Sequence, residues 1–277
     1  MRRFLVAAGV AVTITAAGCG STTATPSLEN HELTAAEVLQ ETAQKTDKVT
    51  SYAADIVMDI TGPNGETGNI EGTMRAQTAP TAAFDLTLDK MSSAGQDIPG
   101  GMRMILDGRV AYMKMDMLKA LMGGDKAWVK IDLAKAGAQA GLDMDQLLGQ
   151  ANQMDLRTNI KMLTASKDIK SVGSEKVGGV DTTHFAGSYP VSEALKQLPA
   201  EARKQAETQM TGMKDMKFDV WIDGEGLPRK MAVKAEQAKT MAMDMTMLFK
   251  SFNEKLTIKA PPASQVAEMP TNVPLGG

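Results

Sequence analysis

The chain has 277 residues, of which 43% are hydrophobic and 23% are charged, so it can bury a sizeable core and is not disordered by composition. Its formal net charge is −3 and it has no extended run of Lys and Arg, which excludes nucleic acid as a partner. A single cysteine excludes an internal disulfide framework and a zinc site built from thiolates.

Residues 1–18 have the layout of a secretory signal. Two arginines precede a short apolar stretch, and small residues precede Cys19. The stretch is too short for a membrane-spanning helix. Residues 16–19, Ala-Ala-Gly-Cys, resemble the bacterial lipobox, which implies that Cys19 receives a diacylglyceryl group and becomes the N-terminus once residues 1–18 are removed. An ordinary cleavable signal that leaves a free thiol is the alternative.

A tether and a helix follow the signal. Residues 19–32 are polar and rich in Ser and Thr, which is typical of a flexible linker from the lipidated cysteine. Thr34 and Glu37 then match a capping box, and apolar residues follow at helical spacing. We therefore expect a helix at about 34–47.

Alternating apolar residues predict six strands after this helix. They lie at about 51–60, 68–77, 84–89, 102–106, 109–115 and 126–132. Turn residues such as Asp107-Gly108 separate them, and Asp-Gly is a strong hairpin signal. Consecutive strands joined by short turns predict an antiparallel meander with one buried face and one solvent-facing face.

The apolar period shifts toward 3.6 residues at 116–165 and again at 191–212, which predicts short amphipathic helices. Helices that interrupt a meander must lie across one face of its sheet, so we interpret these as a lid. The lid residues expected to face the sheet are Leu118, Leu121, Leu147, Leu148, Leu156, Ile160, Leu163 and Leu195.

Five more strands complete the predicted sheet. They lie at about 169–177, 180–189, 216–223, 227–237 and 241–259. In the last of them four methionines alternate with small or polar residues, so their thioethers share one face. The whole pattern predicts one α+β domain at 33–262, with a large curved antiparallel sheet of ten or eleven strands, helices on its concave face, and a loose tail at 263–277.

Three segments resemble the actinobacterial lipoproteins of the LppX/LprG type, within the LolA-like superfamily. They are Asp107-Gly-Arg-Val-Ala-Tyr112, Gly179-Val-Asp-Thr-Thr-His-Phe185 and Trp221-Ile-Asp-Gly-Glu-Gly-Leu-Pro-Arg-Lys230. The resemblance covers about residues 33–262, and its motifs mark topology rather than chemistry. It implies an unclosed half-barrel with helices in its mouth, and several members carry acylated lipids or glycolipids in the cavity between sheet and helices.

The residues expected to line such a cavity come from the strand periodicity alone. Methionine has three free torsions and adapts to irregular shapes, so a Met-rich face suits variable acyl chains better than a uniquely packed core. The predicted lining is Met58, Ile60, Phe84, Leu86, Leu88, Met102, Met104, Leu106, Phe218, Val220, Ile222, Met231, Val233, Met241, Met243, Met245 and Met247.

The sequence therefore predicts a lipoprotein on the outer face of the cell membrane, held through Cys19, that binds acylated lipids or glycolipids and is a candidate for their transfer. The alternative is a surface interaction or structural lipoprotein whose core is filled by its own side chains. The sequence identifies no transporter partner.

Neither an enzyme nor a metal centre is expected. The two histidines, His31 and His184, stand outside any catalytic motif, and no G-x-S-x-G, H-E-x-x-H or phosphate loop is present. Thioethers suit Cu(I), so a Met-rich copper protein is a further alternative. Same-face residues of one strand lie about 6 to 7 Å apart, however, too far to share an ion without a partner strand or a nearby histidine.

Overall fold

In the computed structural model, the described residues all belong to one compact unit within residues 33–277. The structure describes residues 33–62, 64–79, 81–116, 126–133, 156–196, 200, 203–204, 207, 212–237 and 241–268. The helices in these ranges include α1 (Ala35–Thr46), α5 (Leu156–Leu163), α6 (Val191–Leu195) and the short 3-10 helix η1 (Ala263–Gln265).

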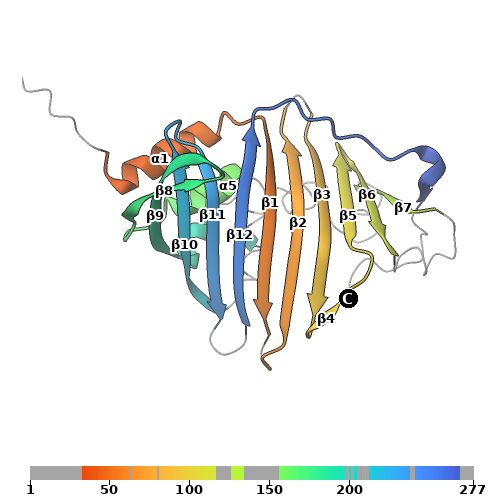
Figure 1. The fold of residues 1–277 in the computed structure, drawn as a ribbon, viewed down its shortest axis with the longest axis horizontal. Coiled ribbons are helices and arrows are strands. Elements are labelled where there is room, and N and C mark those ends of the chain that lie inside the picture. Colours follow the sequence, from red (N-terminus) through yellow and green to blue (C-terminus); the bar gives the residue numbers. More distant parts are fainter. Residues whose placement is uncertain are drawn as a thin grey trace, which may run out of the picture. The chain divides into compact units, whose positions relative to one another are not determined.

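In the described part of the chain, thirteen strands form a single sheet (Figure 1). They are β1 (Ser51–Thr61), β2 (Thr67–Gln77), β3 (Ala83–Ser93), β4 (Gln96–Asp97), β5 (Met102–Asp107), β6 (Val110–Met115), β7 (Trp128–Asp132), β8 (Lys170–Val177), β9 (Val180–Pro190), β10 (Met213–Asp223), β11 (Pro228–Gln237), β12 (Met241–Phe252) and β13 (Val266–Glu268). The eleven longer strands are those that the alternation predicts, and β4 and β13, of two and three residues, have no alternation to detect.

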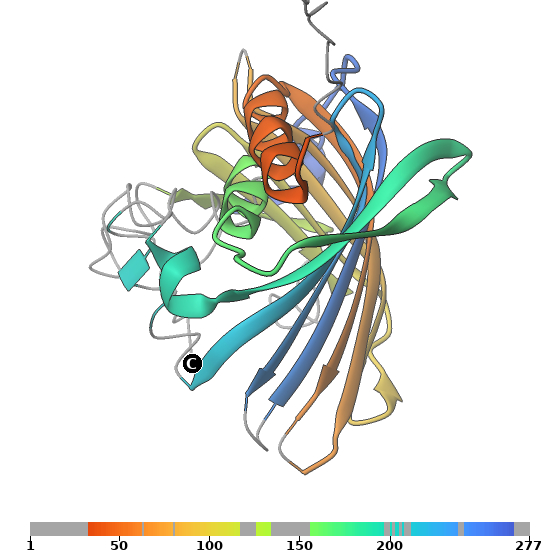
Figure 2. The same cartoon turned by 90° about the vertical axis from the view of Figure 1, so that its left-hand side faces the viewer.

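The sheet consists of two meanders joined side by side. The strand order is β13-β7-β6-β5-β3-β2-β1-β12-β11-β10-β9-β8, with β4 beside β3. Every pairing is antiparallel except that of β13 with β7. The ends of this order, β13 and β8, do not pair, so the sheet is unclosed, and Figure 2 shows it curving around α1 and α5. The predicted fold class is therefore confirmed.

The prediction of a loose tail from residue 263 is wrong for residues 263–268. Val266 to Glu268 pair with Trp128 to Lys130 of β7, and the Lys126 ammonium donates to the Val266 carbonyl oxygen over 2.9 Å. This strand covers the backbone groups at the β7 edge, which would otherwise offer a template for unwanted pairing.

Helix α1 begins at the predicted capping box. The Thr34 hydroxyl accepts a hydrogen bond from the Glu37 N–H (3.3 Å), and the Glu37 carboxylate accepts one from the Thr34 N–H (2.7 Å). Leu39 is fully buried on the face that α1 turns toward the rest of the domain. The helix expected at 34–47 is thus confirmed at 35–46.

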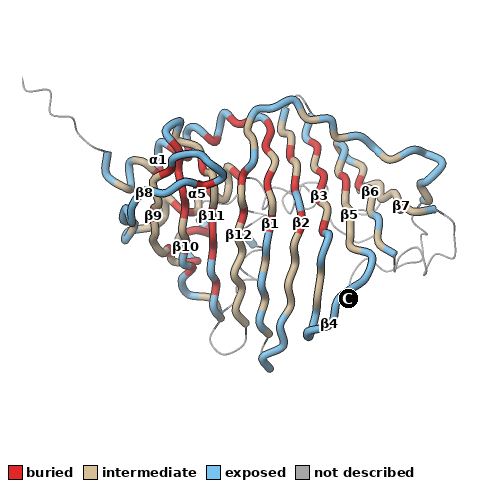
Figure 3. Tube along the Cα trace, in the orientation of Figure 1, coloured by how far each residue is buried: buried red, intermediate tan, exposed pale blue. Residues whose placement is uncertain are grey.

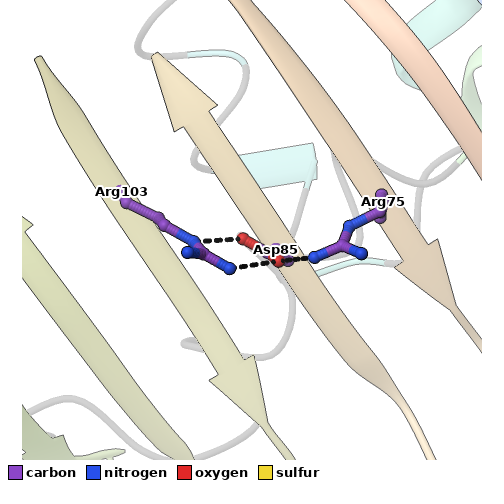
Figure 4. Close-up of polar contacts among 3 residues, drawn as sticks. All are labelled: Arg75, Asp85 and Arg103. Carbon is purple, nitrogen blue, oxygen red and sulfur yellow. Dashed lines mark hydrogen bonds and ion pairs between the residues drawn. The ribbon is translucent and has the colours of Figure 1, made fainter. Parts of the chain in front are cut away.

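An ion cluster joins β2, β3 and β5 on the sheet face opposite the helices (Figure 4). The side chain of Asp85 is 3% exposed, and its carboxylate accepts hydrogen bonds from Arg103 (3.0 and 2.9 Å) and from Arg75. Burial raises the pKa of the Asp85 carboxyl, but hydrogen bonds and charges from Arg103 and Arg75 outweigh burial and hold that pKa below its usual value.

Candidate functional site

The pairing register gathers all the predicted cavity residues on the face of the sheet that α1, α5 and α6 cover. Two rows across the strands show this. One row is Val220, Met231, Met247, Ile56, Gly72, Leu88 and Met102, and the next is Phe218, Val233, Met245, Met58, Ile70 and Met91. Side chains contributed by segments more than 150 residues apart therefore form one continuous apolar surface.

One half of this face is filled by the protein itself. The lid residues Leu156, Ile160, Leu163 and Leu195 are buried, and so are the predicted cavity residues beneath them and nearby. Those buried cavity residues are Phe218, Val220, Ile222, Met231, Val233 and Met247, and Leu86 and Leu88 of β3 are buried beside Met104 and Met102. Helix α6 contacts β9 and β10, and α5 contacts both α1 and α6. Figure 3 shows buried segments on β10 and β11 beside α1 and α5, and further buried segments on β1, β2 and β3.

The environment of Tyr189 shows that water is excluded from this filled half of the face. Its ring packs against Phe218 with centroids 5.9 Å apart, and its hydroxyl donates to the Met216 sulfur over 3.4 Å. Burial raises the pKa of the Tyr189 phenol to about 12. The phenol therefore stays neutral at any physiological pH, and this part of the domain is a packed core.

The other half of the face remains partly exposed. Met58, Ile60, Phe84, Met102, Met104, Leu106, Met241, Met243 and Met245 are all of intermediate exposure, and they belong to β1, β3, β5 and β12. We call the central part of this surface the methionine floor, which consists of Met58, Ile70, Met91, Met102, Met104, Met243 and Met245. It is an apolar surface that the described helices leave accessible.

Two members of the methionine floor, Ile70 and Met91, are not among the cavity residues predicted from the sequence, and Met91 could not have been found from alternation. Glu71 of β2 pairs with Lys90 and Gly72 pairs with Leu88, so Asp89 is an extra residue that makes a bulge in β3. Continuing the alternation from Leu88 would place Lys90 on the helix-bearing face, but the bulge brings Met91 there instead, opposite Ile70. Only a rule for bulges, which the local pattern does not supply, could have found Met91.

Several predicted residues lie outside the described part of the chain. These are the lipidation residue Cys19, the first histidine His31, and the lid residues Leu118, Leu121, Leu147 and Leu148. Of the predicted lid residues, the structure therefore describes only those of α5 and α6.

The second histidine lies on the outer face, away from the methionine floor. His184 Nε2 is 2.7 Å from Asp219 Oδ1, and its ring stacks on Trp221 with centroids 4.1 Å apart. Lys230 lies over the same indole, 4.2 Å from its centroid. Each group is engaged by a structural partner, so the arrangement serves to fix Trp221. Within the described ranges, no group of three or more His, Cys, Asp and Glu side chains could hold a metal ion.

A pocket of about 400 Å³ lies on this outer face, where the β8–β9 hairpin approaches β12 and β1. Val57, Val177, Trp221 and Leu248 form its apolar part, and charged residues such as Lys230 surround them. It is distinct from the predicted cavity because its lining residues alternate with those of the methionine floor.

Among the described helices, none is long and apolar enough to cross a membrane.

No family model matches this sequence. A 31.2 kDa protein of Streptomyces griseus, encoded between rplA and rplJ, is 28% identical over 197 residues, which are 68% of this chain and 63% of that protein. A Streptomyces coelicolor protein, provisionally named a lipoprotein, is 25% identical over 151 residues, or 52% of this chain and 43% of that one. The chain thus spans less than two thirds of either relative.

Solved structures with a similar fold include lipoprotein LppX of Mycobacterium tuberculosis, with 13% identity, a TM-score of 0.47, and coverage of 81% of this chain and 98% of LppX. LprF of Mycobacterium bovis has 14% identity, a TM-score of 0.49, and coverage of 82% and 96%. A LolA superfamily protein of Nitrosomonas europaea has 8% identity, a TM-score of 0.30, and coverage of 84% and 97%. The structural neighbours of this chain therefore include LppX, LprF and a LolA superfamily protein.

Proposed function

We propose that this protein is a membrane-anchored lipoprotein that binds the acyl chains of lipids or glycolipids on the methionine floor, between the sheet and its helices. One observation carries the proposal. Partly exposed methionines from β12, β1, β3 and β5 lie side by side on one face, next to a fully packed core. Large accessible apolar surfaces on folded proteins mark sites where a ligand or another molecule binds.

The chemistry of the face supports an apolar ligand. In the described strands β1, β2, β3, β5 and β12, no position facing the helices holds a charged side chain. Binding would therefore come from buried area, at about 0.8 kcal/mol for each methylene removed from water. Thioether side chains repack around chains of different length, so specificity would be broad.

Transfer of lipid between membranes would follow from such binding, because a ligand held by area alone can leave by the route through which it entered. The anchor rests on the lipobox-like residues 16–19, and the lipoprotein name of the Streptomyces coelicolor relative supports it. These features support a location outside the cytoplasm, on the outer face of the membrane. They support a binding protein rather than an enzyme.

Lipid extraction tests the proposal directly. The chain starting at Gly20 contains the whole compact unit of residues 33–277 and lacks the acylated cysteine. Organic extracts of this protein, examined by mass spectrometry, should contain acylated lipid in a fixed ratio to protein, and a fluorescent fatty acid should bind saturably. If extracts contain no lipid and uptake is absent, the alternative of a surface module with a filled core holds instead.

The anchor has its own prediction. Cys19→Ser removes the thiol to which the diacylglyceryl group would attach, so the protein should leave the membrane fraction or accumulate as a precursor that retains residues 1–18. Fractionation and intact-mass measurement distinguish these forms, and Ser21→Ala serves as the matched control that should stay anchored. A Cys19→Ser protein that is both cleaved and fully membrane-bound would contradict the assignment.

A further inference from the structure

Four methionines form a two-by-two block on the β5–β6 hairpin. Met102 lies directly opposite Met115, and Met104 lies directly opposite Met113. Met102 and Met104 are opposite Leu88 and Leu86, so all four side chains are on the face of the sheet that carries the helices. Each of the four is of intermediate exposure. The block therefore offers four accessible thioethers in a fixed arrangement.

The partner strand removes the geometric objection to a shared ion. Directly opposed residues have Cβ atoms about 5 Å apart, and same-face neighbours along a strand are about 7 Å apart. The centre of such a rectangle is about 4 Å from each Cβ. A sulfur two bonds beyond Cβ, with a metal–sulfur bond of about 2.3 Å, spans that distance. All four thioethers can thus reach a single ion above the centre of the block.

The hairpin holds this arrangement in place. The turn between the strands has Gly108 in the left-handed region, with φ of 61°, and the β5–β6 register is regular from Met102–Met115 to Asp107–Val110. A tight turn sets the register of its hairpin, and a one-residue slip would move every side chain to the other face. The backbone therefore fixes the positions from which the four methionine side chains start.

The chemistry of the block is selective. Thioethers are soft, neutral ligands that favour Cu(I) over hard cations. The carboxylate of Asp116 lies against Gly100, two residues before Met102, and places a negative charge close to the end of the block. Elsewhere on the face, Met231 and Met247 also oppose each other but are only 1% and 5% exposed, so they are packed core.

We propose that Met102, Met104, Met113 and Met115 form a thioether binding site for a soft monovalent d10 cation, of which Cu(I) is the biological example. The argument for the site does not depend on acyl-chain binding, but Met102 and Met104 also belong to the methionine floor. Bound lipid and bound metal would compete for these two side chains.

Titration with Ag(I), a redox-inert d10 cation, tests the site. The full chain is used in nonionic detergent and chloride-free nitrate buffer, with Cys19→Ser as the background because a free thiolate would itself bind silver. Calorimetry should show one tightest Ag(I) ion per chain. In the variant with Met104→Leu and Met113→Leu, affinity for that ion should fall at least tenfold. These swaps nearly conserve volume, so the fold should be kept, and circular dichroism checks it.

Met58→Leu combined with Met245→Leu is the matched control, because these two methionines also oppose each other on the same face with intermediate exposure. It should keep wild-type affinity within twofold. The proposal is overturned if the wild type does not bind Ag(I), if the block variant keeps its affinity, or if both variants lose it equally. Should the double block variant fail to fold, Met113→Leu alone must still weaken binding several-fold, and unchanged binding there overturns the site.

Discussion

Replacing Met245 with lysine should reduce uptake of a fluorescent fatty acid at least tenfold, a loss of about 1.4 kcal/mol or more. Met245 lies at the middle of the methionine floor, between Val233 of β11 and Met58 of β1. An acyl chain lying there would bury the ammonium group without a partner, and burying an unpaired charge costs several kcal/mol. Fluorescence titration of the chain starting at Gly20 measures the loss.

Thr246→Lys is the matched control, because the next residue of the same strand points to the opposite face, beside Val57 and Ala232. It adds the same charge to the same strand and should leave uptake within twofold of the wild type. Met243→Leu combined with Met245→Leu should also preserve uptake, since only apolar area is required. Equal uptake by the Met245→Lys protein and the wild type would show that ligand binds elsewhere or does not bind.

Asp85→Ala should lower the free energy of unfolding by about 2–3 kcal/mol at pH 7. The change leaves Arg75 and Arg103 facing each other without the carboxylate that accepts from both. The loss is smaller than for a fully buried pair because the two arginine side chains are 42% and 39% exposed and can turn toward water. Urea unfolding followed by circular dichroism measures the difference.

Glu71→Gln is the control for this change. Glu71 pairs across β2 and β3 with Lys90 over 2.7 Å, but both side chains are exposed, and exposed pairs contribute at most about 1 kcal/mol. Similar losses for Asp85→Ala and Glu71→Gln would mean that burial of the Asp85 cluster adds nothing.

The same cluster sets a pH dependence. Because the pKa of Asp85 is lower in the folded state than in the unfolded state, the stability it contributes is fully present above its unfolded pKa of about 3.9. That stability is lost as the pH falls below this value and through the folded pKa. The difference in unfolding free energy between wild type and Asp85→Ala should therefore shrink from pH 5 to pH 2.

Much of the fold was accessible from local sequence pattern. The period of two along each strand predicts which residues share a face, and the Thr34–Glu37 capping box predicts where α1 begins. Alternation and capping involve only a few neighbouring residues, so they can be recognised without knowing which strands or helices the element packs against. The five long strands after residue 168 and the six before residue 133 were found for this reason.

Two features of the candidate site depend on contacts that no local pattern reports. The β12 strand with its four methionines pairs with β1, almost 200 residues earlier in the chain. This pairing places the β12 methionines at the centre of the apolar, helix-bearing face of the sheet. The bulge beside Gly72 moves Met91 onto that face. An alanine Cβ at Gly72 would lie 2.1 Å from the Thr87 carbonyl oxygen, so the close approach of β3 there requires glycine.

The sequence by itself determined the strands, the first helix, the shared apolar face and the lipobox-like start, because alternation and capping are properties of neighbouring residues. Only the tertiary structure decided the order of the strands and how far the helices fill the face. It also decided which thioethers meet across strands, as Met102 meets Met115 and Met104 meets Met113. The physical reason is that pairing register and burial are set by side chains far apart in the chain, which compete for the same surface only when the sheet forms.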